Sequence, residues 1–291
     1  ARDDLIMVNI VGNPDGSTAL DYTVNCAVGL PQITGGGHDN APVNHVLPAW
    51  DISAGLTAAV AILAAERHRR LTGEGQYVRL SLADVALAMV GHLGFIAEAD
   101  HGRSQRRAHG NHLFGAFGRD FATIDGRRIM IVAISPRQWR NLCEATGLAE
   151  KMALLEQVFE ADFDREGDRF EARDAIASLI ETWCETRSLV QIAEVFDAAG
   201  VCWGRYQSFR QLLDEDARCS VDNPLFELVE HPGVGEYLMP GSTLDFGAAP
   251  RVSMQAATQM GQHTDEVLSE ILGLGDAEIG RLHDSQIVAA A

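Results

Sequence analysis

Hydrophobic and polar positions along the chain follow two different periods, and together they predict alternating strands and helices. Continuous apolar and β-branched stretches predict strands at 4–11 and 76–81. Apolar residues at helical spacing predict helices at 20–30, 51–71 and 82–98. A strand, two helices, a second strand and a third helix, in that order, are typical of an α/β layered domain.

A different pattern follows further along the chain. Two strand-like runs, 119–124 and 127–134, flank Asp125-Gly126, which is a strong hairpin signal. Periodicity then predicts helices at 136–146, 150–159, 168–186, 189–198, 263–272 and 276–283, and strands at 201–203, 226–229 and 236–239. The elements of this second pattern up to residue 222 predict a small α+β domain.

The shifts in pattern define the expected domain organisation. Residues 1–99 are expected to form part of a large α/β domain. The polar, glycine-containing stretch 100–112 is predicted to be a linker. Residues 113–222 are expected to form the small α+β domain, and 223–291 to return to the large domain.

Composition and charge narrow the classes of function. The 291 residues include 23 Lys and Arg against 41 Asp and Glu, a formal net charge of −18. Because such a chain repels phosphate backbones and anionic lipids, we expect neither a nucleic-acid nor a membrane partner. The apolar stretches 54–65 and 82–97 are shorter than the roughly 20 residues of a membrane span. Five scattered cysteines without a C-x-x-C pair predict a cytoplasmic protein with reduced, buried thiols.

The sequence lacks the familiar metal and nucleotide motifs. His109 and His112 lie three residues apart in a glycine-broken segment without a carboxylate at helical spacing, so we expect no metal site. No Gly-rich dinucleotide fingerprint, phosphate-binding loop or serine-nucleophile elbow occurs. The basic run 67–70 is most simply explained by the favourable charge at a helix C-terminus, with binding of a polyphosphate as the alternative.

Asp51 stands at the expected start of the most regular helix, and position alone leaves two interpretations open. As a helix N-cap, its side chain would accept the first backbone N–H groups and contribute about 1 kcal/mol. The same N–H groups and the helix dipole favour the carboxylate over the acid. Beside the small residues Ser53, Ala54 and Gly55, an ionised carboxylate is also a workable nucleophile toward a thioester.

Residues 44–87 carry several features in a fixed order. They comprise Asp51 at the start of an alanine-rich helix, A-x-x-R at 64–67, G-x-G-Q at 73–76 and Ala83-Asp84-Val85. With the hairpin D-G-R-R-I-M-I-V and the tail G-Q-H-T-D-E-V-L, the chain resembles the family III CoA-transferases over essentially its whole length. The stretches DLIMVNIVG, LDYTVN, VNHVLPAWD and GNHLFGAFGRDF resemble a branch that moves CoA between the two carboxyl groups of one branched C4 dicarboxylate.

This resemblance implies an enzyme with Asp51 as the nucleophile and an aspartyl-CoA thioester as an intermediate. The CoA thioester is the substrate, and no permanently bound cofactor is expected. A dicarboxylate needs hydrogen-bond donors in the site. For this role we select His45, Asn111, His112 and Arg119, against the alternatives of loop polarity and surface ion pairs. No residue is assigned to CoA binding.

The resemblance also carries expectations about architecture and assembly. It implies a Rossmann-like large domain, whose N-terminal part we expect to be absent from this chain, together with the smaller α+β domain. It further implies an interlocked homodimer, with an N-terminal fragment of the same protein as a conceivable additional chain.

One departure and two alternatives complete the prediction. Related α-methylacyl-CoA racemases carry a His-Asp pair at the position of Leu20-Asp21, and because Leu20 cannot take a proton, racemisation is disfavoured. The first alternative is an intermolecular CoA-transferase that uses a free acid as acceptor. The second is a non-catalytic fragment or partner subunit, in which Asp51 only caps a helix.

Overall fold

The structure is a computed structural model that describes residues 2–36, 41–102 and 106–289. The chain divides into two units, Ala1–Tyr206 and Gln207–Ala291. Both units contain helices and strands, so the predicted mixed α/β class is confirmed at that level. Residues 103–105 of the predicted linker lie outside the described residues, and the domain boundaries expected from the sequence stay predictions.

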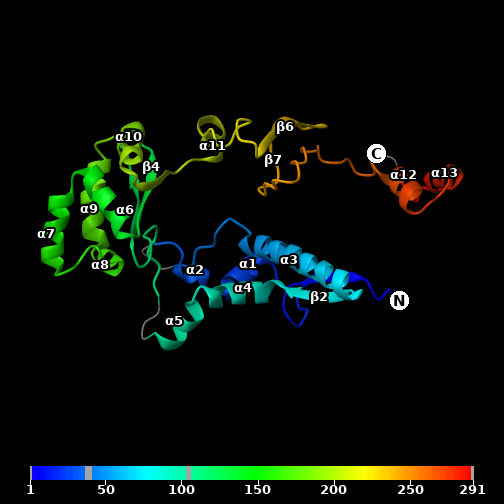
Figure 1. Cartoon of the computed structure of the whole chain (residues 1–291), viewed down its shortest axis with the longest axis horizontal. Helices are drawn as coiled ribbons and strands as arrows, with labels where there is room; N and C mark the ends of the chain where they lie inside the picture. The colour runs from blue at the N-terminus through cyan, green and yellow to red at the C-terminus, as the bar shows by residue number, and fades with distance from the viewer. Residues whose placement is uncertain (1, 37–40, 103–105, 290–291) are drawn as a thin grey trace. The chain divides into compact units, whose positions relative to one another are not determined.

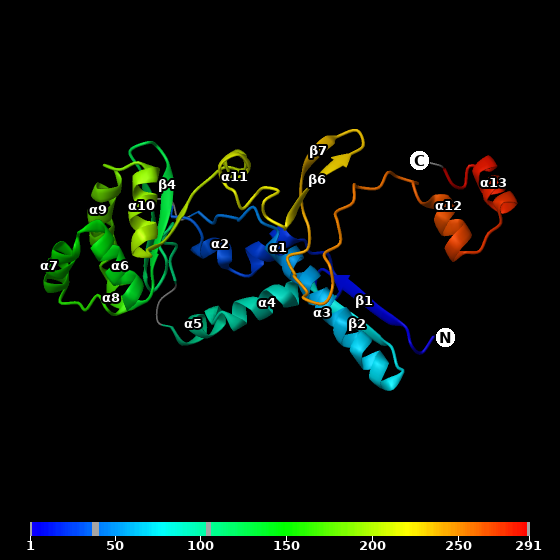
Figure 2. The same ribbon diagram turned by 45° about the horizontal axis from the view of Figure 1, so that its top comes forward.

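The first part of unit 1 is a pair of parallel strands joined by a helical connection. Strand β1 (Ile6–Val11) pairs with β2 (Gln76–Ser81) in the register that places Ile6 opposite Gln76. Parallel neighbours require a crossover connection, and here it contains the long helix α3 (Ala49–Thr72). Figure 2 shows α3 alongside the two strands, and α3 contacts both of them.

Glycines break two helices that periodicity predicted to be continuous. The expected helix 20–30 is α1 (Asp21–Ala27) followed by α2 (Leu30–Ile33), with Gly29 between them at φ 86°. The expected helix 82–98 is α4 (Leu82–His92) followed by α5 (Phe95–His101), with Gly94 at φ 86°. Both predictions were wrong, because this left-handed backbone conformation suits glycine and ends the run of helical hydrogen bonds.

Helix α3 has two apolar faces, of which this chain buries one. The buried residues recur at helical spacing: Trp50, Ala54, Ala58 and Ala65. The other face, here called the exposed α3 face, consists of Ile52, Leu56, Val60 and Leu63. These four side chains are 45% to 70% exposed. By length and composition alone α3 could cross a membrane, and the predicted apolar stretch 54–65 is part of this longer helix.

The second part of unit 1 is an antiparallel sheet with helices packed against it (Figure 1). The strands are β3 (Phe117–Ala122), β4 (Arg128–Ala133) and β5 (Cys202–Arg205), in the order β3-β4-β5. The helices are α6 (Pro136–Thr146), α7 (Ala149–Phe159), α8 (Glu166–Glu171), α9 (Arg173–Cys184) and α10 (Leu189–Ala199). The predicted hairpin at Asp125-Gly126 is confirmed, whereas the predicted helix 168–186 is interrupted at Ala172.

Unit 2 contains less regular structure. Its elements are α11 (Phe209–Glu215), β6 (Phe226–His231), β7 (Gly235–Pro240), α12 (Thr264–Glu266), a π-helix (Val267–Ile271) and α13 (Asp276–Asp284). The strands predicted at 226–229 and 236–239 are confirmed as β6 and β7, which pair as an antiparallel hairpin. Periodicity did not predict α11. The predicted helix 263–272 is α-helical only at Thr264–Glu266 and π-helical at Val267–Ile271.

The cysteines are unpaired but unequally buried. Cys143 and Cys184 are buried, and burial raises the pKa of both thiols to about 12. Cys26 and Cys202 are exposed, so the prediction that the thiols are buried is wrong for these two.

Candidate functional site

Asp51 does not cap the helix on which it lies. Helix α3 begins at Ala49 with Pro48 at the N-cap position, which places Asp51 third in the helix. The N-cap interpretation was therefore wrong. The Asp51 side chain is exposed and makes no hydrogen bond or ion pair with the described part of the chain. Its carboxylate is thus free to meet a ligand.

The cap of α3 comes from a distant residue, Asp21. Its Oδ2 accepts hydrogen bonds from the backbone N–H groups of Trp50, at 2.7 Å, and Asp51, at 3.2 Å. The first N–H groups of a helix have no acceptor within the helix, so this carboxylate satisfies two of them. Asp21 is 2% exposed, and its other oxygen, Oδ1, is buried without a partner among the described residues.

Asn25, one turn after Asp21 in α1, orders the side chains around it. Its Oδ1 accepts a hydrogen bond from the indole Nε1 of Trp50 at 3.2 Å, and its Nδ2 donates to Asn44. Because Oδ1 can only accept, the Nε2 of His45, 3.1 Å away, must carry the hydrogen. The Nδ1 of His45 is then the nitrogen left for a ligand, and it is buried without a partner in the described part of the chain.

A second group of predicted residues lies at strand β3. Asn111 hydrogen-bonds to Asp120, which also forms an ion pair with Arg128. Burial by itself would raise the pKa of the Asp120 carboxyl, but these hydrogen bonds and the charge of Arg128 lower it below its usual value. Asn111 therefore has a structural partner already.

His112 and Arg119 are held more loosely. The Nε2 of His112 lies 3.5 Å from Asp174, and Nη2 of Arg119 lies 3.9 Å from Glu181. The pKa of His112 lies below its usual value of 6.5, first because the ring is partly buried and second because Arg119 is positively charged. The two long contacts are with solvent-exposed carboxylates, so a substrate carboxylate could replace them at small cost.

A close backbone contact ties the segment before His112 to the segment after α2. The N–H of Gly110 donates to the carbonyl of Gly35 at 2.7 Å. A Cβ atom on Gly36 would lie 2.7 Å from the Cα of Gly110, so only glycine fits at position 36 without a shift. This contact anchors Gly110, the residue just before Asn111 and His112, to the segment that follows α2.

The structure thus brings the five predicted residues into two groups. His45 is linked through Asn25 to the side chain of Trp50, the residue that precedes Asp51 at the start of α3. Asn111, His112 and Arg119 lie around β3, and no hydrogen bond or ion pair between described residues joins them to Asp51. Asp21 and Asn25 were not predicted as site residues, because their partners are 19 to 30 positions away along the chain.

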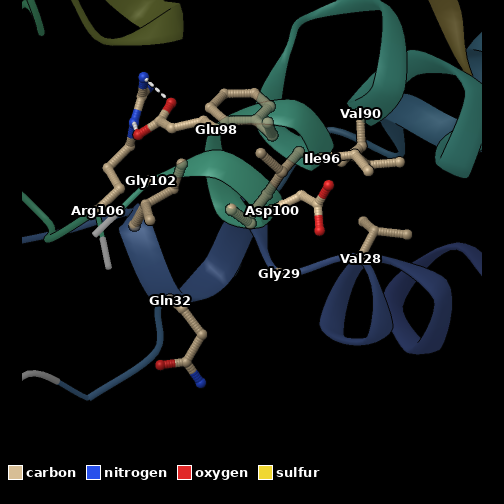
Figure 3. Close-up of a pocket in the computed structure, with 13 residues that line it drawn as sticks. Val28, Gly29, Gln32, Val90, Ile96, Glu98, Asp100, Gly102 and Arg106 are labelled. Atoms are coloured by element: carbon tan, nitrogen blue, oxygen red, sulfur yellow. Dashed lines mark hydrogen bonds and ion pairs between the residues drawn. The ribbon is translucent and has the colours of Figure 1, made fainter. Parts of the chain in front are cut away.

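A pocket of about 780 Å³ lies in the first part of unit 1, lined by α2, α4, α5 and their connections. Figure 3 shows Arg106 paired with Glu98 at this pocket. The guanidinium of Arg106 also stacks on Phe114, 3.7 Å from the ring centre. None of the five predicted residues lines this pocket. Among the described residues, no group of three or more His, Cys, Asp or Glu side chains could hold a metal ion.

Comparison with known proteins gives a family. The model of the family described as CoA-transferase family III matches residues 4–264. The chain is 53% identical to 2-methylfumaryl-CoA isomerase of Chloroflexus aurantiacus, over 99% of this chain and 70% of that protein. It is 26% identical to formyl-CoA:oxalate CoA-transferase of Streptomyces coelicolor, over 90% and 65% of the two chains. It is 24% identical to human succinyl-CoA:glutarate CoA-transferase, over 92% of this chain and 59% of that protein.

The fold has solved counterparts. The crystal structure of a CAIB/BAIF family protein from Brucella suis matches with a TM-score of 0.70 at 19% identity, covering 92% of this chain and 68% of that one. The three curated relatives above are longer than this chain, which spans between 59% and 70% of their length.

Proposed function

Because this chain belongs to CoA-transferase family III, we propose that it catalyses CoA transfer within one molecule, between the two carboxyl groups of 2-methylfumaryl-CoA. The observation that carries this proposal is the identity of 53% over 99% of the chain to an enzyme of that name. The intermolecular transferases match at 24% and 26%. The substrate therefore supplies both the donor thioester and the acceptor carboxylate.

The proposed chemistry runs through the carboxylate of Asp51 and returns it unchanged. Asp51 attacks the thioester carbonyl and the C–S bond breaks, giving a mixed anhydride and the CoA thiolate. The thiolate attacks the Asp51 carbonyl, which forms an aspartyl-CoA thioester and frees the substrate as a dicarboxylate. Its other carboxylate then attacks the aspartyl thioester, and the thiolate finally attacks the new substrate carbonyl. The four steps restore Asp51 and consume no proton.

The surroundings of Asp51 support this role. A nucleophile must be accessible, and the Asp51 side chain is exposed and unpaired within the described residues. The neighbouring helix positions are Ser53, Ala54 and Gly55, and a Cβ atom on Gly55 would meet open space. A thioester can therefore approach this side of the helix without displacing a large side chain.

The proposed recognition of the free carboxylate uses the loosely held donors. Arg119 is the strongest candidate, because a guanidinium binds a carboxylate with two parallel hydrogen bonds and its contact with Glu181 is long. His112 would add a further polar contact, and His45 would add one through its unpartnered Nδ1. Asn111 is the weakest candidate, since its side chain already binds Asp120.

Trapping of the acyl intermediate tests the proposed nucleophile. Incubation of the full chain with 2-methylfumaryl-CoA and hydroxylamine is expected to leave a hydroxamate on Asp51, found by peptide mass spectrometry. Asp51→Asn is expected to abolish both turnover and labelling. Glu150→Gln removes an exposed carboxylate from the first turn of α7 and serves as the matched control with normal turnover. Full turnover by Asp51→Asn would reject the mechanism, and inactivity of the wild-type chain would favour a non-catalytic fragment or partner subunit.

Isotope incorporation separates the two kinds of transfer. An intermolecular enzyme transfers CoA to a separate free acid. The names of the formyl-CoA:oxalate and succinyl-CoA:glutarate relatives state such an acceptor. During turnover of unlabelled 2-methylfumaryl-CoA, added labelled 2-methylfumarate should therefore stay free if transfer is intramolecular. Label in the thioester pool at the rate of turnover would replace the proposal with the intermolecular reaction.

The proposal extends to assembly and location. The exposed α3 face supports an interlocked homodimer, because apolar faces of this kind in soluble proteins mark contacts with other protein surfaces.

A parallel sheet is ordinarily covered on both faces and has more than two strands. Among the described residues the parallel sheet has only the strands β1 and β2, which supports a Rossmann-like large domain completed by further polypeptide, such as an N-terminal fragment. A cytoplasmic location follows from the CoA thioester substrate, with α3 packed on protein instead of lipid.

A further inference from the structure

The short helix α1 buries two polar side chains on one face. Asp21 is 2% exposed and Asn25 is 1% exposed, and they are four positions apart. Residues at this spacing lie on the same side of a helix, one turn above the other. Burying a carboxylate and an amide is costly unless they are hydrogen-bonded. Four of the five hydrogen bonds of this pair run to segment 45–51, at or just before the start of α3.

Asp21 supplies a cap that α3 itself lacks. Pro48 occupies the N-cap position and has no side-chain acceptor. The N–H groups that Asp21 binds belong to the second and third helical residues, which are the ones that an N-cap side chain ordinarily satisfies. The carboxylate therefore replaces the missing cap from another element of the fold.

The third helical residue is Asp51, the proposed nucleophile. Asp21 therefore binds the backbone of Asp51 directly, while Asn25 holds the indole of the preceding Trp50. Because Asp21 holds the backbone N–H groups of residues 50 and 51 and Asn25 holds the side chain of residue 50, the direction in which the side chain of residue 51 leaves the helix is restricted. A reacting group needs this kind of support, since a misplacement of about 1 Å can reduce the rate of a reaction about 100-fold.

We propose that Asp21 is a positioning residue for the nucleophile, which it orients by capping the first turn of α3. This inference rests on the proposed function, because it assumes that Asp51 reacts. Asp21 touches neither substrate nor CoA in this scheme. Its effect is on the geometry of attack, so its loss lowers kcat and kcat/KM together and leaves KM nearly unchanged.

The geometry allows a test that separates hydrogen bonding from charge. Both N–H groups bind the same oxygen, Oδ2, and Oδ1 has no partner among the described residues. In Asp21→Asn the amide oxygen can take the place of Oδ2, so this variant is expected to retain kcat within a few-fold. Asp21→Ala has no acceptor, and its kcat is expected to fall about 10- to 100-fold. A loss in Asp21→Asn as large as in Asp21→Ala would overturn the inference.

A matched cap variant controls for a general loss of stability. Ser135 caps α6 by accepting the N–H of Gln138 and lies among residues without a proposed role in the reaction. Ser135→Ala is expected to lower the melting temperature and leave kcat unchanged. Hydrogen exchange should be faster in Asp21→Ala at the amides of residues 50 and 51, and unchanged there in Ser135→Ala. Normal kcat in Asp21→Ala would also overturn the inference.

The outcomes remain distinguishable if a variant fails to fold or the proposed function is wrong. Should Asp21→Ala yield no folded protein, Asp21→Ser takes its place, because its shorter side chain removes the acceptor from the reach of both N–H groups. Full kcat in that variant would likewise reject the role. Activity in Asp51→Asn rejects the proposed function itself, whereas an inactive Asp51→Asn with a fully active Asp21→Ala rejects only the role of Asp21.

Discussion

The two parts of unit 1 bury apolar side chains to very different degrees. The part built on β3, β4 and β5 has a core of 20 buried hydrophobic residues, among them the fully buried Phe117, Ile129 and Ile176. The part built on β1, β2 and α3 has a cluster of five: Val24, Trp50, Ala54, Leu82 and Ala86.

This difference indicates which part depends on other surfaces. A core of aromatic and aliphatic side chains supplies its own stability by burial. The α3 part keeps an apolar face exposed and holds its helix start through buried polar groups, Asp21 and Asn25. The proposed nucleophile lies on this part, so its geometry relies on a few directed hydrogen bonds more than on close packing.

The largest expected contrast is in stability. Phe121 is 1% exposed in the larger core, and Phe121→Ala is expected to cost about 3–5 kcal/mol of the free energy of unfolding. Leu63 is 70% exposed, so Leu63→Ala is expected to cost little when the chain is dilute. Urea denaturation followed by tryptophan fluorescence measures both, since Trp139 and Trp183 report on the larger core and Trp50 reports on the α3 part.

The concentration dependence of this contrast tests the exposed α3 face. If a second chain covers that face, the cost of Leu63→Ala grows with protein concentration, because binding of the native state adds to its stability. The cost of Phe121→Ala should not change with concentration. Equal effects of the two substitutions at low concentration would contradict the comparison of the two parts.

Local signals in the sequence predicted most of the β3–β5 part. Asp125-Gly126 marked the hairpin, and Ser135 and Ser188 cap α6 and α10 by reciprocal hydrogen bonds with glutamines three residues later. These features depend on residues close together in the chain. The helix breaks at Gly29 and Gly94 were missed, because the apolar periodicity continues across both glycines.

The candidate site was only partly predictable for the same physical reason. Asp51 could be selected as a candidate because it lies near the start of a regular helix and because the surrounding sequence resembles family III. The residue that supports it could not be predicted, because Asp21 lies 30 positions before Asp51. Pro48 at the N-cap position gives no sign that a residue from another helix caps α3. Likewise, the partners of His112 and Arg119 lie on α9, far along the chain, so sequence alone could not rank these residues as substrate ligands.

A medium effect is expected for Arg119, which belongs to the well-packed part. If its guanidinium binds the substrate carboxylate, Arg119→Ala loses a charged hydrogen bond of about 1.5–3 kcal/mol, or roughly 10- to 100-fold in kcat/KM. Arg119→Lys should recover only part, because an ammonium cannot form the paired contact. Arg140→Ala is the matched control, since Arg140 pairs with Asp164 on the surface. Normal kinetics in Arg119→Ala would remove this residue from the site.

The smallest expected effect is a pH dependence of stability. It tests whether His112 is buried in the well-packed part of unit 1. The pKa of His112 in the folded chain lies below its usual value of 6.5, chiefly through burial. The unfolded chain therefore binds more protons between the two pKa values, and stability is lost as the pH falls through about 6.5. His112→Gln should remove this contribution, so its melting temperature should fall less than that of the wild type between about pH 7.5 and about pH 5.5. An identical fall in both proteins would mean that His112 is as solvated in the folded chain as in the unfolded one.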